Sequence, residues 1–160
     1  MANGSDGTAG KIDVAVENRS GFAINANDIS GKAAKALALL GAGGGELGII
    51  FVSPEEISSL NRKHLGRVGA TDVLAFPLDA TGQPDAGPAI NASAAPVLLG
   101  DVVICPKVAE EQAVEAGSSL AEELCLLLIH GILHICGFDH ETDNGQMDER
   151  QAVLAAEICR

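Results

Sequence analysis

The chain has 160 residues, of which 47% are apolar, and its formal net charge is −12. This length and apolar content predict one globular domain with a sizeable core. The acidic charge argues against a protein that binds nucleic acid through its overall charge. The absence of Trp and Tyr argues against a surface that stacks single-stranded bases. Any contact with a polyanion must therefore be local.

The N-terminus, the apolar segments and the cysteines favour a cytoplasmic protein that does not enter a membrane. Residues 1–10 are small and polar and lack the apolar segment of a signal peptide, so we expect a flexible tail. The stretch 124–138 is uncharged but shorter than the roughly 20 residues of a membrane span. The four cysteines form no CxxC pair, and so large a chain needs no disulfide framework. We expect four free and mostly buried thiols.

The first predicted elements are a strand, a helix and a second strand. Apolar and polar residues alternate over 11–17, as in a half-buried strand. Asn27 or Asp28 is expected to cap a helix that runs to about Leu40, where the sequence GAGGG ends it. Residues 46–52 are apolar and β-branched, which predicts an interior strand.

A helix, an edge strand and a long loop should follow. The sequence SPEE at 53–56 has a serine N-cap, a proline in the first turn and a glutamate three residues after the cap. This capping box predicts a helix that ends near His64. Residues 71–78 predict a third strand, in which Pro77 requires an edge or an end because proline lacks an amide hydrogen. Residues 79–96 are rich in Ala, Gly and Pro without periodicity, so we expect a mobile loop.

A fourth strand and a polar helix are expected after this loop. The apolar residues at 97–105 predict the strand, with an interruption at Gly100 and Asp101. Pro106 is then suited to the first turn of a polar helix that ends near Gly117.

The most apolar helix of the chain begins at a second capping box, SLAE at 119–122. It should run from Leu120 to about Cys136 and lie at the centre of the core, because it is apolar nearly all round. A final amphipathic helix is expected at 149–159. Together these elements predict a single α+β domain over 11–160, in which about five helices pack on a four-stranded sheet.

Three of the four histidines lie in the sequence HGILHICGFDH at 130–140. His130 and His134 are four residues apart and project from one face of the helix. Gly137 can adopt the left-handed conformation that ends a helix, which would bring His140 back to the same point. Three neutral imidazoles with an open fourth position are a typical ligand set of catalytic zinc. We predict a site for one zinc ion, with nickel, iron or manganese as alternatives.

The spacing HxxxHxxGxxH also occurs in metzincin peptidases, where a glutamate after the first histidine is the general base. Gly131 takes that position here, which argues against a peptidase. Among the nearby carboxylates, which include Glu141 and Asp143, Asp139 is our candidate catalytic residue. It could accept a hydrogen bond from a ligand histidine or a proton from the attacking water. The alternative is that Asp139 only tightens the turn after Gly137.

The only cluster of cations consists of Arg62, Lys63 and Arg67. It lies at the end of the helix that begins at residue 53 and in the loop beyond. We predict that it contacts the phosphate groups of a nucleic acid. The alternative is a solvated helix end, whose positive charges complement the helix dipole.

The sequence at 130–140 closely resembles the signature of the YbeY family of rRNA maturation factors, bacterial metallo-endoribonucleases specific for single-stranded RNA. The sequences LNRKHLGRVGATDVLAFP at 60–77 and LLGDVVICP at 98–106 are similar to two further family segments. The resemblance implies an α+β fold, zinc held by the three histidines of the motif, and action on ribosomal RNA. That action includes 16S rRNA 3′ end maturation and ribosome quality control, with the small ribosomal subunit and ribosomal proteins or assembly factors as partners.

Two positions depart from the family pattern. Many members have an arginine in place of Leu65, for which Arg67 is the nearby replacement, and many have a serine in place of Ala75. A competing hypothesis is a ribosome-assembly factor that acts by docking and whose metal is structural. Structural zinc usually has four protein ligands, and Cys136 would lie on nearly the opposite side of the helix from His134.

Overall fold

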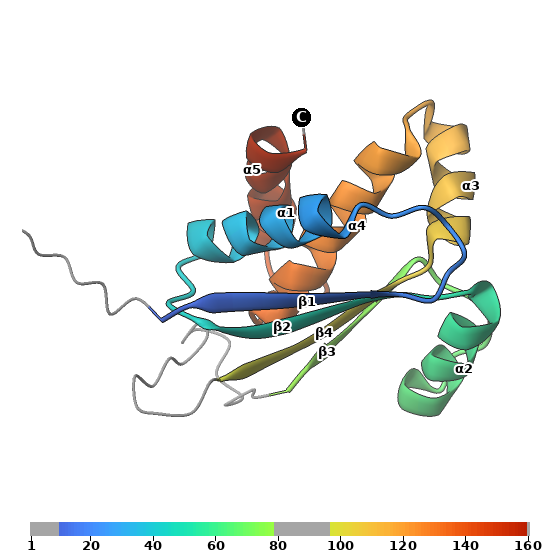
Figure 1. Ribbon diagram of the computed structural model, residues 1–160, viewed down its shortest axis with the longest axis horizontal. Helices are drawn as coiled ribbons and strands as arrows, with labels where there is room; N and C mark the ends of the chain where they lie inside the picture. The colour runs from blue at the N-terminus through green and yellow to red at the C-terminus, as the bar shows by residue number, and fades with distance from the viewer. Residues whose placement is uncertain (1–9, 79–96, 160) are drawn as a thin grey trace, which may run out of the picture.

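Four strands form one sheet in the computed structural model, which describes residues 10–78 and 97–159 (Figure 1). The strands are β1 (Ile12–Asn18), β2 (Gly45–Phe51), β3 (Val73–Pro77) and β4 (Leu98–Ile104). The helices are α1 (Ala26–Leu39), α2 (Pro54–Leu65), α3 (Pro106–Ala116), α4 (Leu120–Ile135) and α5 (Gln146–Ile158). The predicted α+β fold is confirmed. The predicted loop at 79–96 and all but the last residue of the predicted tail lie outside the described residues.

The sheet has the strand order β1-β2-β4-β3, in which β1, β2 and β4 are parallel and β3 is antiparallel to β4. The predicted position of Pro77 is confirmed, because it is the last residue of the edge strand β3. The predicted interruption at Gly100 and Asp101 is wrong, since β4 continues through both residues. The pairing with β2 shifts register just before these residues, because Glu46 pairs with Leu98 and Leu47 pairs with Gly100.

The two predicted capping boxes differ in the structure. Around Ser119 the box is complete, with Ser119 Oγ accepting from the Glu122 amide at 3.1 Å and the Glu122 carboxylate accepting from the Ser119 amide. At α2, Ser53 Oγ accepts from the Glu56 amide at 3.2 Å. The Glu56 carboxylate forms an ion pair with Arg19, at 3.1 Å. Both helices therefore start where predicted. In the Ser53 box, however, the Glu56 carboxylate pairs with Arg19, a tertiary contact, and not with the Ser53 amide.

The start of α1 was predicted too late in the chain. Its N-cap is Asn25, whose side-chain oxygen accepts a hydrogen bond from the Asp28 amide at 3.1 Å. Asn and Asp have nearly equal preferences for the N-cap position, so local sequence does not distinguish Asn25 from Asn27 or Asp28. As a result Asp28 lies within the first turn, where its charge complements the helix dipole.

The main core lies between the sheet and helices α1, α4 and α5, which cover one face (Figure 1). Helix α4 is central, as predicted, and Leu128, Ile129, Ile132 and Leu133 on it are fully buried. A smaller apolar cluster lies on the opposite face, where α2 packs. Among the described helices, none has by itself the length and apolarity to cross a membrane. Only α3 and α4 together reach that length and composition, with a bend of 115° between them.

The expectation of four free thiols is wrong. Cys125 on α4 and Cys159 at the end of α5 form a disulfide across 34 residues of sequence. This pairing depends on the packing of α5 beside α4, which the cysteine spacing does not reveal. The other two cysteines, Cys105 and Cys136, are free and buried. Burial raises the pKa of the Cys105 thiol, and it raises the pKa of the Cys136 thiol to about 11, so neither is a reactive thiolate.

Candidate metal centre

The three histidines of the motif converge at the end of α4. His130 and His134 lie on consecutive turns of the helix, and their Nε2 atoms are 3.2 Å apart. Gly137 has a φ of 95°, the left-handed conformation predicted for it, and the chain reverses after it. This reversal returns His140, so that one ring nitrogen of each histidine lies within 4.8 Å of the other two. The structure thus brings together the residues that the spacing predicts.

The chemistry of this cluster fits a transition metal with nitrogen ligands. Burial, followed by the neighbouring His130 and His140, lowers the pKa of His134. Its ring is therefore kept in the neutral form that binds metal ions. Nitrogens at about 2.0–2.1 Å from a tetrahedral zinc lie about 3.3 Å from each other. The 3.2 Å between His130 Nε2 and His134 Nε2 fits that spacing. Cys136 does not belong to the cluster that the described residues form, which leaves three protein ligands.

One neighbour of the cluster was missed in the sequence. The Nδ1 atom of His130 lies 3.0 Å from Oε1 of Gln151 on α5. Gln151 is half-buried on the helix stripe that also contains Met147, Leu154 and Ile158, all of which are buried. A polar side chain on an otherwise apolar stripe is costly to bury without a hydrogen-bond partner. The place of Gln151 on this apolar stripe is the sequence signal that could have identified it.

The three carboxylates after Gly137 have different surroundings. Asp139 Oδ1 accepts from the Glu141 amide at 3.0 Å, so Asp139 does tighten the turn. Both carboxylate oxygens of Asp143 accept hydrogen bonds at the start of α5, from the amides of Gly145 and Met147. This contact explains why α5 begins three residues before the predicted start. The catalytic role of Asp139 stays a prediction, and Glu141 shares its access to the site.

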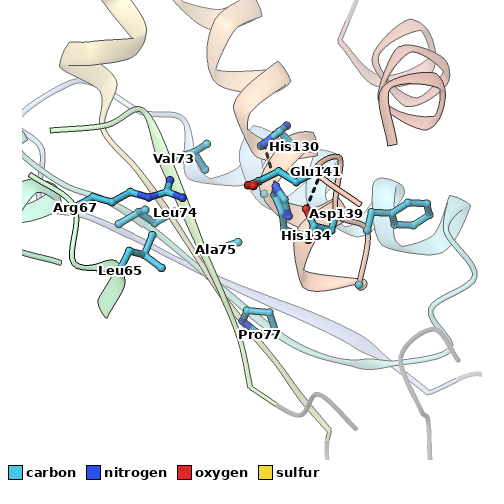
Figure 2. Close-up of a pocket in the computed structure, with 13 residues that line it drawn as sticks. Leu65, Arg67, Val73, Leu74, Ala75, Pro77, His130, His134, Asp139 and Glu141 are labelled. Atoms are coloured by element: carbon cyan, nitrogen blue, oxygen red, sulfur yellow. Dashed lines mark hydrogen bonds between the residues drawn. The ribbon is translucent and has the colours of Figure 1, made fainter. Parts of the chain in front are cut away.

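A pocket of about 490 Å³ opens beside the histidines (Figure 2). On one side are His130 and His134, with the loop that carries Asp139 and Glu141. Strand β3 contributes four apolar residues to the lining, namely Val73, Leu74, Ala75 and Pro77. On the other side, Arg67 extends toward the histidines above Leu65.

The predicted cation cluster is divided by the structure. Arg67 lines the pocket, whereas Arg62 and Lys63 are exposed on the last turn of α2, outside the described part of the lining. The predicted contact of Arg62 and Lys63 with phosphate groups has no support from the pocket. Arg67 is placed by Asn61, whose carbonyl accepts from the Arg67 amide at 3.3 Å and whose side chain donates to the Gly69 carbonyl at 3.1 Å.

Asn61 is a second residue that sequence analysis missed. It is only 5% exposed and follows the buried Ile57 by one helical turn, so it is a polar residue on the buried side of α2. It therefore holds the loop after α2 in place through hydrogen bonds to its backbone. The fourth histidine, His64, lies outside the metal cluster and packs edge-on against Phe76 of β3.

Gly131 shows why the general base of a metzincin is absent at this position. A Cβ atom there would lie 2.5 Å from Cγ1 of Val102 on β4, because α4 packs closely on the sheet. The position after the first histidine thus faces the sheet, and even an alanine would force a rearrangement. This geometry supports the sequence argument against a peptidase.

Comparisons with known proteins agree with the geometry. The family model described as Endoribonuclease YbeY matches residues 14–158. An Endoribonuclease YbeY of Salinispora tropica is 43% identical over 132 residues, which cover 81% of this chain and 83% of the relative. One of Mycobacterium ulcerans is 34% identical over 148 residues, covering 90% and 78%. A solution structure of a Thermotoga maritima protein, 28% identical, matches 91% of this chain and 88% of its own with a TM-score of 0.61.

Proposed function

The chain belongs to the endoribonuclease YbeY family, and on this basis we propose that it is a metal-dependent endoribonuclease that cleaves single-stranded ribosomal RNA. The proposal includes maturation of the 16S rRNA 3′ end and ribosome quality control. Its partners would be the small ribosomal subunit and its proteins or assembly factors. Such a substrate implies a cytoplasmic location.

The observation that carries the proposal is the convergence of three histidine nitrogens beside an open pocket. His130, His134 and His140 would hold one zinc ion, for which three nitrogen ligands and an open position are suited to catalysis. A zinc ion held there would act as a Lewis acid that could polarise a phosphoryl oxygen and lower the pKa of an attacking water. The lowered pKa of His134 keeps that ring available as a ligand near neutral pH.

The other residues of the pocket have separate tasks in this proposal. Arg67 would bind a phosphate group and orient the RNA backbone toward the histidines. Asp139 would accept the proton of the attacking water, with Glu141 as the alternative acceptor on the same loop. Because the net charge of the chain is −12, the single arginine in the pocket provides little long-range electrostatic attraction for RNA. Binding should therefore depend on local contacts and respond strongly to their loss.

Metal-loaded protein should cleave a single-stranded rRNA fragment, and protein treated with EDTA should not. Adding zinc back to the EDTA-treated protein should restore cleavage, and the same fragment annealed into a duplex should resist it. His134→Ala protein, which lacks one ligand, serves as the matched control for a contaminating nuclease. Equal cleavage by wild type and His134→Ala would reject the proposed active site.

A second candidate is an assembly factor that acts by docking, with a metal that only stabilises the fold. The acidic net charge favours it, because such a surface suits basic ribosomal proteins. The three-ligand cluster argues against it, since structural zinc is usually closed by four protein ligands. Binding to small-subunit proteins without metal-dependent RNA cleavage would favour this candidate.

A further inference from the structure

We propose that Gln151 is a positioning residue for the metal centre and sets the ring tautomer of His130. This inference rests on the proposed function, in which His130 is a metal ligand. In this role the residue would touch neither the substrate nor the metal. Its effect would be to present His130 Nε2 to the cluster as a free lone pair.

The contact with His130 carries the inference. Gln151 Oε1 lies 3.0 Å from Nδ1, while Nε2 of the same ring faces His134 Nε2 at 3.2 Å. An amide oxygen only accepts hydrogen bonds, so Nδ1 must carry the single hydrogen of the neutral ring. Nε2 then has no hydrogen and can bind a metal ion.

A reversed amide would have the opposite effect. If the Gln151 NH₂ group donated to Nδ1, the ring hydrogen would lie on Nε2 and point into the cluster. Metal binding requires the orientation in which Oε1 accepts. A glutamate at this position could only accept, whereas a leucine of similar size could do neither. These two substitutions therefore separate hydrogen bonding from side-chain volume.

The position of Gln151 is fixed from both ends of α5. Near the start of the helix, Asp143 accepts a hydrogen bond from the Met147 amide at 2.8 Å. Asp143 is only three residues beyond His140, so this bond ties the start of α5 to the metal cluster. At the far end, the Cys125–Cys159 disulfide joins α5 to α4. Buried Met147 and Leu154 flank Gln151 on the same helix stripe. The amide is thus held beside His130 by core packing, as a positioning role requires.

The test compares Gln151→Leu, Gln151→Glu and wild type, with Gln112→Leu as the matched control. Gln112 is also half-buried and donates one hydrogen bond to Asp72, at 3.1 Å, so its loss reproduces the general cost of removing a bonded glutamine. Zinc affinity is measured by competition with a chelator. The His130 tautomer is measured in metal-free protein from imidazole ¹⁵N chemical shifts, and the unfolding midpoint is recorded for every variant.

We expect Gln151→Leu to bind zinc about 10- to 100-fold more weakly and to lose the preference for the Nδ1–H tautomer. Gln151→Glu should retain that tautomer and bind zinc at least as tightly as wild type. Gln112→Leu should leave both readouts unchanged. Wild-type affinity and tautomer in Gln151→Leu would overturn the inference. Weaker binding by Gln151→Glu would also overturn it, and this variant remains informative if the leucine variant does not fold.

The same titration separates this inference from the proposed function. If wild type and His130→Ala bind zinc equally, the proposed metal centre is wrong. If only His130→Ala loses zinc while Gln151→Leu matches wild type, the metal centre stands and the role of Gln151 is rejected.

Discussion

The two sides of the pocket are built in different ways. The histidine side comes from a continuous sequence at 130–140, on the central core helix and the reversal that follows it. The arginine side comes from the exposed loop after α2. Helix α2 itself packs on the opposite face of the sheet from α4. Gln151 and the close packing of Gly131 support the first side, and Asn61 supports the second.

This difference separates chemistry from recognition. Shifting the backbone of His130 or His134 would require movement of α4, which lies against the sheet and packs beside α5. By contrast, Leu65 and Arg67 are exposed residues whose replacement disturbs little of the core. A departure from the family pattern at Leu65 is therefore compatible with an intact metal centre. Variants on the two sides should affect different measurements.

The largest effect is expected on the histidine side. Replacing His134 with alanine removes one of three ligands, so bound zinc and RNA cleavage should be lost together. His130→Ala and His140→Ala should behave in the same way. Metal content is measured by elemental analysis after gel filtration, and cleavage with a labelled rRNA fragment. A variant that keeps its full zinc content would remove that histidine from the site.

The carboxylates of the loop should affect turnover with the metal still bound. Asp139→Asn preserves size and removes the charge, and kcat should fall by about 10²-fold or more if Asp139 accepts the proton. Glu141→Gln is the matched control, since it removes a charge from the same loop and the same pocket. Wild-type turnover in Asp139→Asn would leave only its role in the turn. A larger loss of kcat in Glu141→Gln than in Asp139→Asn would identify Glu141 as the proton acceptor.

Gly131→Ala tests how rigidly the core holds the histidine side. The added Cβ would meet Val102 at 2.5 Å, and such overpacking typically costs about 1–3 kcal/mol of unfolding free energy. The control is Gly31→Ala on α1, where a Cβ meets nothing within 4 Å. That substitution should stabilise the protein by up to about 1 kcal/mol, because alanine favours helices. Denaturant titration measures both, and equal effects would contradict the close packing of α4 on β4.

On the arginine side, Arg67→Ala should weaken RNA binding and leave zinc content unchanged. Losing one phosphate contact should make the log–log salt dependence for single-stranded RNA shallower by roughly 0.7. Arg62→Ala, which removes the same charge outside the described pocket lining, should change the salt slope less. Fluorescence anisotropy at several salt concentrations distinguishes them. A wild-type slope and affinity in Arg67→Ala would show that this arginine does not contact phosphate and that the cluster is a solvated helix end.

The smallest effect is expected from Leu65→Arg, which restores the residue common in the family. Leu65 lines the pocket beside Arg67, so the new guanidinium should partly rescue RNA affinity in the Arg67→Ala background. In the wild-type background it should add only a modest gain. Failure to rescue would show that position 65 does not reach the bound RNA.

Helix boundaries show how far local signals extend. The starts of α2 and α4 could be predicted because each serine N-cap bonds to an amide three residues away. The cap of α1 could not, because Asn25, Asn27 and Asp28 have similar capping preferences. The predicted partner of the Glu56 carboxylate, the Ser53 amide, was also wrong, because the observed partner Arg19 is far away in the chain. Local sequence thus located most helices but could not choose between competing partners.

The sequence by itself determined the histidine side of the pocket, because helical spacing and a left-handed glycine bring together residues that are close in the chain. It also determined the edge position of Pro77 through the missing amide hydrogen. Only the tertiary structure decided that Cys125 meets Cys159 and that His130 meets Gln151, pairs separated by 34 and 21 residues. It likewise decided that Arg67 reaches the pocket and that Arg62 does not. These contacts depend on how α5 packs on α4 and how the loop after α2 passes β3, and no local spacing encodes that packing.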